Sequence, residues 1–276
     1  MPPILLHLAA AALYAGLAVV SWRTRWRGPV LDRSPRGIVP WERALLLLAI
    51  VLHGATLGAE IFSAAGMRFG FSLALSLILW LAIVLYWIES FYARMDGLQM
   101  LGLPLAALCV MLPPFFPGEP LVANAGSAMF RAHFLIAMLA YSLFTLAAMH
   151  AILMAVAESN LHRGRLTPLL SGLPPLLTME ALLFRMIHIG FALLTLTLAS
   201  GILFSETLFG KPLSFTHKTV FAIISWFIFG HLLAGRHFFG WRGRKALRWT
   251  LAGFAALLLA YVGSRFVLEV ILGRAA

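Results

Sequence analysis

The sequence predicts an all-α integral membrane protein, a bundle of about eight transmembrane helices with both termini on the non-cytoplasmic side. Three observations lead to this prediction. The 276 residues are 62% hydrophobic and 11% charged, and the mean hydropathy of +0.93 exceeds what a soluble chain of this size can bury. Apolar runs of about 20 residues, the length that crosses ~30 Å of hydrocarbon, recur along the chain. Lys and Arg gather in alternate loops, which gives the orientation.

Eight apolar segments are the expected spans. The first follows no basic leader, so we expect it to be retained as a span. The fourth contains Pro104 and ends at Pro113, but a full crossing there keeps the later loops on the sides that their charges require. The third, residues 70–88, is apolar all round, and we expect it to contact lipid. The spans are approximately residues 3–21, 43–64, 70–90, 97–115, 130–157, 181–204, 217–235 and 248–270.

The positive residues divide unequally between the two sides of this bundle. Fifteen of the 21 Lys and Arg residues fall on one side, which the positive-inside rule makes cytoplasmic, so both termini are expected on the other side. We explain the formal charge of +11 by loops that face anionic lipid; we expect membrane lipid as a partner and no nucleic acid. The cytoplasmic residues are Arg23, Arg25, Arg27, Arg33, Arg36, Arg43, Arg94, Arg163, Arg165, Arg185, Arg236, Arg242, Arg244, Lys245 and Arg248.

Residues 1–276 are expected to form a single membrane domain, because no polar segment is long enough for a soluble one. Two outer loops, residues 113–130 and 205–217, are candidates for ligand contact. The inner loop 158–180 is apolar enough to lie along the membrane surface. Cys109 is the single cysteine, so the chain forms no internal disulfide. The sequence contains no P-loop, no GxSxG and no carboxylate pair, so we expect no catalytic residues.

Histidines inside the apolar segments are the candidate functional residues, because an ionisable side chain is costly within a membrane. The candidates are His53, His133, His150, His188, His217 and His231. Three others are set aside because they fall in basic loops or near a terminus. These are His7, His162 and His237.

Depth sorts the candidates into two groups. At 1.5 Å per residue, three of them lie roughly 7–9 Å to the cytoplasmic side of their helix centres. We call His150, His188 and His231 the inner group. His133 and His217 lie near the opposite surface and form the outer group.

Helical periodicity predicts which way these side chains face. His217 and His231 fall within ~40° of each other on one stripe of the seventh span. His53, near mid-membrane, shares an inward polar face with Glu60. His188 lies on a stripe of small residues, so we expect it to face the bundle interior. That stripe comprises Ala192, Thr195 and Ala199.

Haem fits these histidines better than a single metal ion does. Zinc usually takes three or four protein ligands, often Cys or carboxylate, and no HExxH or HxxE spacing is present. Haem needs one or two axial His and an apolar slot, which four or five helices can provide. The alternative is that each His hydrogen-bonds across helices and has a structural role only.

Five segments of the C-terminal half form a distinctive set: RAHFLIAMLAYS, LFRMIHIGFALLTLTLASGILF, KTVFAIISWFIFG, GWRGRKA and LAYVGSRF. They resemble the CcsA/CcmC-type cytochrome c assembly superfamily, most closely its short HemX/YpjD-like branch. The resemblance covers about residues 130–270, which would be the assembly-like core, and loosely the first spans. The GWRGR hairpin after a Trp-bearing helix is its most specific piece.

The resemblance implies about eight helices that handle haem b in the bacterial inner (plasma) membrane, and delivery towards cytochrome c maturation with a membrane protein partner. It makes His133 an outer haem ligand. Where the family has a tryptophan-rich WWD loop, this chain has SETLFGKPLSFTHK, with Phe209 and Phe215 but no Trp or Asp. Where the family has a second outer His, this chain has the region of Ser264 and Arg265. We therefore expect haem binding without covalent haem attachment.

Three functions remain open at this point. In the first, the inner group holds haem that arrives from the cytoplasm, and His133, with His217 as a partner, holds it nearer the outside. Of the inner group, His231 lies about a turn from the inner His of the family. In the second, the protein is a non-haem accessory or scaffold of a membrane complex. In the third, it transports a small solute and uses His53 and Glu60.

Overall fold

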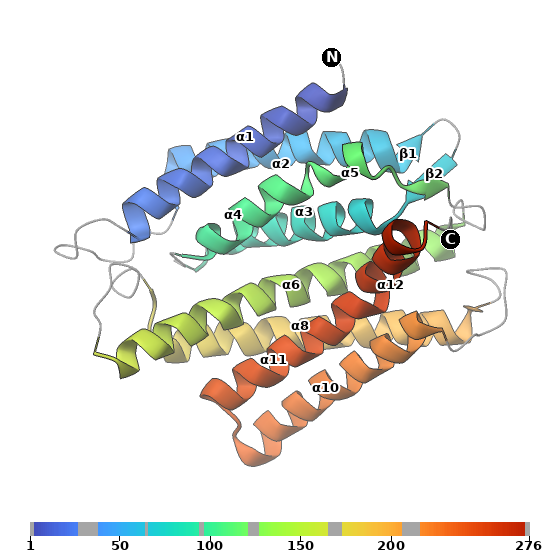
Figure 1. Cartoon of the computed structure of the whole chain (residues 1–276). Helices are drawn as coiled ribbons and strands as arrows, with labels where there is room; N and C mark the ends of the chain where they lie inside the picture. Colours follow the sequence, from blue (N-terminus) through green and yellow to red (C-terminus); the bar gives the residue numbers. More distant parts are fainter. Residues whose placement is uncertain are drawn as a thin grey trace.

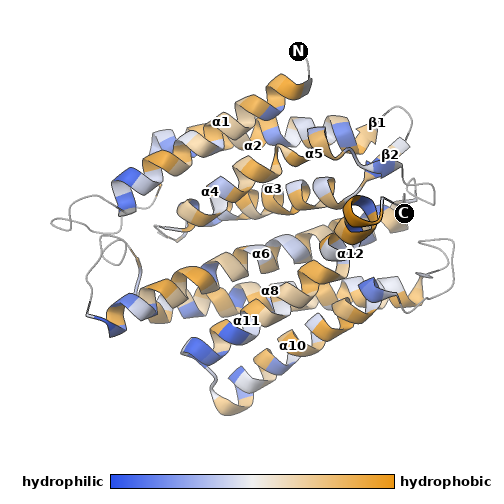
Figure 2. Cartoon of the chain, in the orientation of Figure 1, coloured by the Kyte–Doolittle hydropathy of each residue, from blue (hydrophilic) through white to orange (hydrophobic). Residues whose placement is uncertain are grey.

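The computed structural model describes residues 3–26, 38–63, 66–93, 97–120, 127–164, 173–205 and 216–273. Within these residues, eight helices are long and apolar enough to cross a membrane, which confirms the predicted spans. The helices lie side by side and alternate in direction, so successive loops fall at opposite ends of the bundle (Figure 1). Hydrophilic residues gather towards the helix ends, and apolar residues cover most of the helix middles (Figure 2).

The first four spans come from five helices and one π-helical turn. They are α1 (Pro3–Ser21) with η1 (Trp22–Trp26), α2 (Pro40–Ile61), α3 (Phe71–Glu89), and α4 (Leu98–Cys109) with α5 (Leu112–Phe115). The last four spans are α6 (Ala128–His162), α8 (Leu176–Leu203), α10 (His217–Phe239), and a composite of α11 (Gly243–Leu258), η2 (Leu259–Gly263), α12 (Ser264–Phe266) and η3 (Val267–Ile271).

Three short strands form a small sheet that the all-α prediction did not include. They are β1 (Phe62–Ser63), β2 (Gly66–Phe69) and β3 (Glu119–Pro120), paired antiparallel in the order β1-β2-β3. The Arg68 Nε donates to the Gly118 carbonyl at 2.9 Å, which is a further bond between β2 and the segment before β3. These extended residues pair because backbone groups outside a helix still need hydrogen-bond partners.

Helix α6 is the centre of the bundle. Its residues 141–151 are all buried, and it packs against α3, α8 and α11. The helix begins at Ser127, whose Oγ accepts from the Phe130 N–H at 3.1 Å. The Phe144 ring stacks on Phe229 of α10 with a centroid distance of 3.9 Å. A Cβ at Gly190 of α8 would lie 3.0 Å from Phe144, so the absence of a side chain there permits the close approach.

The expectation that the third span contacts lipid is wrong for most of its surface. Ten residues of α3 are buried, on more than one face, because the helix packs between α2, α4 and α6. Only Ile88 of this helix is exposed. An apolar surface does not distinguish the two environments, because lipid tails are as apolar as a protein core.

The connection between α10 and α11 is a tight glycine hairpin. Gly240 ends α10 with φ of +62°, a left-handed conformation that favours glycine. The chain then folds back, so the Trp241 ring lies against Gly235, where a Cβ would overlap it. Arg236 donates from Nη1 to the Trp241 carbonyl at 3.2 Å. The GWRGR segment thus places its tryptophan against the last turns of α10.

Candidate functional site

Three polar pairs join the first span to α2 at successive depths. They are His7–Glu60, Tyr14–His53 and Arg25–Glu42, which we call the α1–α2 polar pairs. Seven residues separate the first two pairs along each helix. Because seven residues make nearly two helical turns, the members on each helix share one face. This spacing is the sequence signal that would have predicted the pairs.

His7, which sequence reasoning set aside, is buried and makes two short hydrogen bonds. Its Nε2 lies 2.9 Å from Glu60 Oε1, and its Nδ1 lies 2.6 Å from the Val110 carbonyl oxygen. A carbonyl only accepts, so the imidazole donates from Nδ1 to Val110, and its Nε2 shares a hydrogen bond with the Glu60 carboxyl group. The position near the terminus was misleading, because α1 packs along α2 and α4 from its first turns.

His53 is fully buried, and protein groups engage both of its ring nitrogens. Its Nδ1 lies 3.3 Å from the Tyr14 hydroxyl, and its Nε2 lies 2.8 Å from Ser76 Oγ of α3. Neither nitrogen is left for an iron ion. Glu60, which was expected to share a face with His53, pairs with His7.

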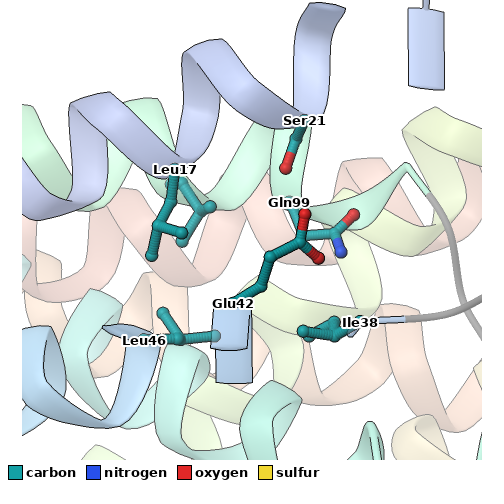
Figure 3. A pocket seen from close by; sticks show the side chains of 7 residues that line it. Leu17, Ser21, Ile38, Glu42, Leu46 and Gln99 are labelled. Atoms are coloured by element: carbon teal, nitrogen blue, oxygen red, sulfur yellow. The ribbon is translucent and has the colours of Figure 1, made fainter. Parts of the chain in front are cut away.

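Arg25 and Glu42 close the other end of α1 and α2. Two guanidinium nitrogens of Arg25 donate to the two Glu42 oxygens at 2.6 and 3.0 Å. Beside this pair is a cavity of about 10 Å³, close to the smallest volume that holds one water molecule. Figure 3 shows Ser21, Glu42 and Gln99 lining it together. The cavity is far too small for haem. Its volume and its polar lining make it a candidate site for one water molecule.

The C-terminal histidines have fewer partners. On α6, His133 Nδ1 lies 2.8 Å from Ser200 Oγ of α8. Ser200 donates its own proton to the Leu196 carbonyl at 2.7 Å, so it accepts from His133 Nδ1–H. The lone pair of the His133 ring is therefore on Nε2. A donating Nδ1 is the arrangement that orients histidines whose Nε2 binds a metal.

His188 of α8 is exposed, which contradicts the expectation that it faces the bundle interior. Its Nδ1 donates to the Phe184 carbonyl of the preceding turn at 2.7 Å, which again puts the lone pair on Nε2. The stripe of small residues is exposed with it. Helix α8 packs on α6 through larger apolar residues instead, and small residues alone were an unreliable sign of a contact face. The buried residues of α8 include Met179, Leu183, Ile187 and Leu194.

His231 and His217 are both exposed on α10. Their spacing predicted that they share a face, but not that this face is exposed. The His231 ring lies beside two indoles and is steeply inclined to both. The centroid distances are 4.9 Å to Trp241 and 4.9 Å to Trp249. The two indoles stack on each other at 6.2 Å. The result is an imidazole held beside a flat aromatic wall and open on its other side. His217 lies at the opposite end, at the first residue of α10.

His150 is fully buried in α6, and within the described residues neither of its ring nitrogens has a hydrogen-bond partner. Buried polar atoms almost always have a partner, so each exception calls for an explanation such as water or an ion. An unpaired imidazole nitrogen fits an iron ligand by its chemistry. The hydrogen bonds described above join His53, His133 and His188 to hydroxyl and carbonyl groups, not to another candidate histidine.

Two further observations bear on the metal. No group of three or more His, Cys, Asp or Glu side chains able to hold an ion occurs among the described residues. Haem uses only one or two protein ligands, so the lack of a three-residue group does not bear on haem binding. The loop that replaces the WWD motif lies mostly outside the described residues, with Phe209 and Phe215. The same is true of the inner loop from 165 to 172.

Comparison with known proteins identifies relatives along most of the chain. The model of the family described as "Cytochrome C assembly protein" matches residues 38–272. The inner membrane protein YpjD of Escherichia coli K12 is 32% identical over 166 residues, which cover 60% of this chain and 62% of YpjD. Cytochrome c biogenesis protein CcsA of Gloeobacter violaceus is 30% identical over 92 residues, covering 33% of this chain and 27% of CcsA. CcsA of Prochlorococcus marinus MIT 9301 is 37% identical over 89 residues, covering 32% and 29%. The chain thus spans less than two thirds of each of these relatives.

Proposed function

The chain belongs to the cytochrome c assembly protein family, and we propose that it binds and handles haem b in the bacterial inner membrane. The observation that carries the proposal is the family match over residues 38–272. The names of relatives, an inner membrane protein and cytochrome c biogenesis proteins, agree with the location and the process. The proposed role is haem binding and delivery within a single membrane domain, with a membrane protein of cytochrome maturation as the partner.

Three histidines are the proposed iron ligands, because their surroundings suit that role. His133 and His188 each donate from Nδ1 to a protein oxygen, which orients the ring and leaves the lone pair on Nε2. His231 lies beside two indoles that would support a flat macrocycle. When bound, haem supplies a redox-active iron and two carboxylates. The chain supplies the imidazoles, the aromatic wall and apolar helix faces that exclude water.

The other three candidate histidines differ in how well their surroundings suit an iron ligand. His150 would be a further inner ligand, because its nitrogens are buried and unpartnered within the described residues. His217 would be a partner to His133 on the outer side. His53 is the least suited, because Tyr14 and Ser76 occupy both of its nitrogens.

The proposed orientation places the basic helix connections in the cytoplasm and both termini in the periplasm. The C-terminal ends of α1, α3, α6 and α10 lie at one end of the bundle (Figure 1). The connections that follow them carry most of the fifteen basic residues assigned to the inside. A cysteine-accessibility scan tests this proposal. Labelling of a cysteine placed at Arg244 by a membrane-impermeant reagent in intact cells would contradict it.

The optical spectrum of the purified protein tests haem binding. We expect a Soret band in the isolated or haem-supplemented protein that shifts or disappears in His133→Ala, His188→Ala or His231→Ala variants. His53→Ala is the matched control, since we expect its haem spectrum to remain unchanged. A colourless protein that acquires no specific spectrum with added haem would overturn the proposal. Covalent attachment to a client is not part of the proposed role, because residues 205–218 lack the Trp-rich motif.

A non-haem scaffold is the second candidate. The extensive lipid-accessible surface of α8 and α10 favours it, since only 22% of the residues in their most apolar windows are buried. Such faces suit a partner helix as well as a cofactor. Stable co-purification of a partner, with the three His→Ala variants still active in cells, would select this role. A solute transporter has the least support, because its proposed pair, His53 and Glu60, does not form.

A further inference from the structure

We propose that Arg265 and Lys218 form an oxyanion-binding site at the outer end of the C-terminal half. Its ligand is a carboxylate or phosphate oxygen, supplied by a haem carboxylate or by an anionic lipid headgroup. The haem source rests on the function proposed above, whereas the lipid source does not.

The first observation is the burial of Arg265. Its side chain is only 10% exposed, although it carries a permanent charge. The residue lies on the single turn α12, between the π-helical segments η2 and η3. Such segments interrupt regular helices mostly in single turns and are frequent at functional sites. One such segment lies on each side of Arg265. This local distortion of the helix positions the Arg265 side chain.

The second observation is that protein groups satisfy Arg265 incompletely. Its Nη1 lies 3.4 Å from Glu269 Oε1, which is a long contact for an ion pair. Glu269 also accepts from the Phe71 N–H, through Oε2 at 3.2 Å, so this carboxylate is shared. The Arg265 Nε is buried and has no hydrogen-bond partner within the described residues. A guanidinium has five N–H donors, so it retains the capacity to bind an acceptor.

The third observation is a second cation next to the same aromatic ring. The Lys218 Nζ lies 5.6 Å from the centroid of the Tyr261 ring, and the Arg265 guanidinium carbon lies 5.8 Å from it. Lys218 comes from the first turn of α10, so two separate elements bring a cation to the Tyr261 ring. Two positive charges with Glu269 as the paired carboxylate leave a surplus of one. A buried surplus charge is costly, and a singly charged anion would offset it.

The walls of the site are apolar and close to the proposed outer haem ligand. The Tyr261 ring lies 5.8 Å from the Phe69 ring, which meets Phe134 edge-on at 4.8 Å. Phe134 follows His133 on α6, so this wall of the site and His133 come from the same turn of α6. In apolar surroundings a charge acts more strongly than in water. Guanidinium groups suit carboxylates and phosphates because the two shapes allow paired hydrogen bonds.

Two probes, each with a matched control ligand, test the site. The first is haem against haem dimethyl ester, in which both carboxylates are blocked, followed by absorbance titration. The second is phosphatidylglycerol against phosphatidylcholine, followed by native mass spectrometry of the detergent-solubilised protein. For at least one probe, we expect the wild-type protein to bind the anionic ligand about tenfold more tightly than its control, as one charge-assisted hydrogen bond allows.

The variants are Arg265→Gln and Lys218→Gln, and each is expected to abolish the preference. Arg265→Lys keeps the charge and is expected to retain part of it. Lys218 is partly exposed, so Lys218→Gln tests the site even if Arg265→Gln fails to fold. Arg244→Gln is the control, because Arg244 is 62% exposed and pairs with Glu158 at the start of α11, far along the last span from Arg265.

The outcomes separate the two proposals. A haem preference lost in the variants assigns the site to haem carboxylates, and a lipid preference lost in the variants assigns it to lipid. If the wild-type protein binds no haem, the proposed function fails, and the lipid titration alone decides the site. If wild type and both Gln variants show the same preference, or none, for both probes, the oxyanion site is overturned.

Discussion

The two halves of the bundle differ in how protein groups engage their histidines. In α1–α4, the three α1–α2 polar pairs satisfy each other or a neighbouring carbonyl. In the second half, His188, His217 and His231 are exposed, and His150 lacks a partner in the described residues. His53 and His150 make the contrast sharpest: both are fully buried, yet His53 has two hydrogen-bond partners and His150 has none in the described residues.

This difference separates two reasons for the presence of a histidine inside a membrane. A satisfied imidazole stabilises the contact between helices, and its loss is expected to affect folding. An unsatisfied or exposed one contributes little to folding, so its presence calls for a ligand. Comparing stability with haem binding for the same substitution in each half therefore tests the division of roles.

Breaking the Arg25–Glu42 pair should give the largest effect. Glu42→Leu leaves a largely buried guanidinium without its carboxylate and is expected to lower the free energy of unfolding by about 3–5 kcal/mol. Unfolding in mixed detergent micelles measures the change. The control is Glu158→Leu, whose partner Arg244 is 62% exposed, and there we expect less than about 1 kcal/mol. Equal losses in the two variants would remove the contrast between the halves.

Replacing His53 should give the next largest effect. His53→Leu leaves the Tyr14 and Ser76 hydroxyls without their partner, in a site closed to water. We expect a loss of about 1–2 kcal/mol in the free energy of unfolding, since hydrogen bonds between membrane helices are modest. The haem spectrum should be unchanged. A spectrum that disappears while the protein remains folded would show that His53 binds the cofactor.

His188→Leu should divide stability from function. The residue is exposed, and its one hydrogen bond is to its own helix. We expect a change in the free energy of unfolding within about 0.5 kcal/mol and a shift or loss of the Soret band. His162→Leu is the matched control, because His162 also bonds only to its own helix, at Glu158. Haem affinity that falls equally in both variants would remove His188 from the proposed ligands.

His150→Leu, unlike His53→Leu, should not destabilise the haem-free protein. The substitution removes two buried nitrogens that lack partners and replaces them with an apolar group of similar size. The free energy of unfolding is expected to stay constant or to rise by about 1 kcal/mol. The same measurement as for His53→Leu applies. A loss as large as that variant shows would mean that His150 is satisfied after all.

Hydropathy and charge were enough to predict the spans, because their length is set by the membrane and not by neighbouring helices. The direction in which a side chain faces was harder to predict. His188 was expected inside because small residues accompany it, but α8 uses Leu183 and Ile187 to contact α6. Helix α3 was expected outside because it is apolar, and the same property suits a helix buried on all sides.

The candidate site was predicted in part. The choice of histidines came from the sequence, and their spacing predicted a common stripe for His217 and His231 but not its exposure. The partners of each imidazole did not, because Ser200, Phe184 and Ser76 come from helices or turns whose rotation the sequence leaves open. His7 was missed because closeness to a terminus was given more weight than its spacing from Tyr14.

The bond between Glu269 and the first amide of α3 has a consequence for biogenesis. Helix α3 is synthesised and inserted early, but the carboxylate that accepts from its Phe71 N–H lies 198 residues later in the chain. That amide must therefore wait for the end of translation to find its final acceptor. A nascent polypeptide released just before Glu269 would contain nearly all of the eight apolar segments. It would still lack the hydrogen bond that joins the third span to the last span.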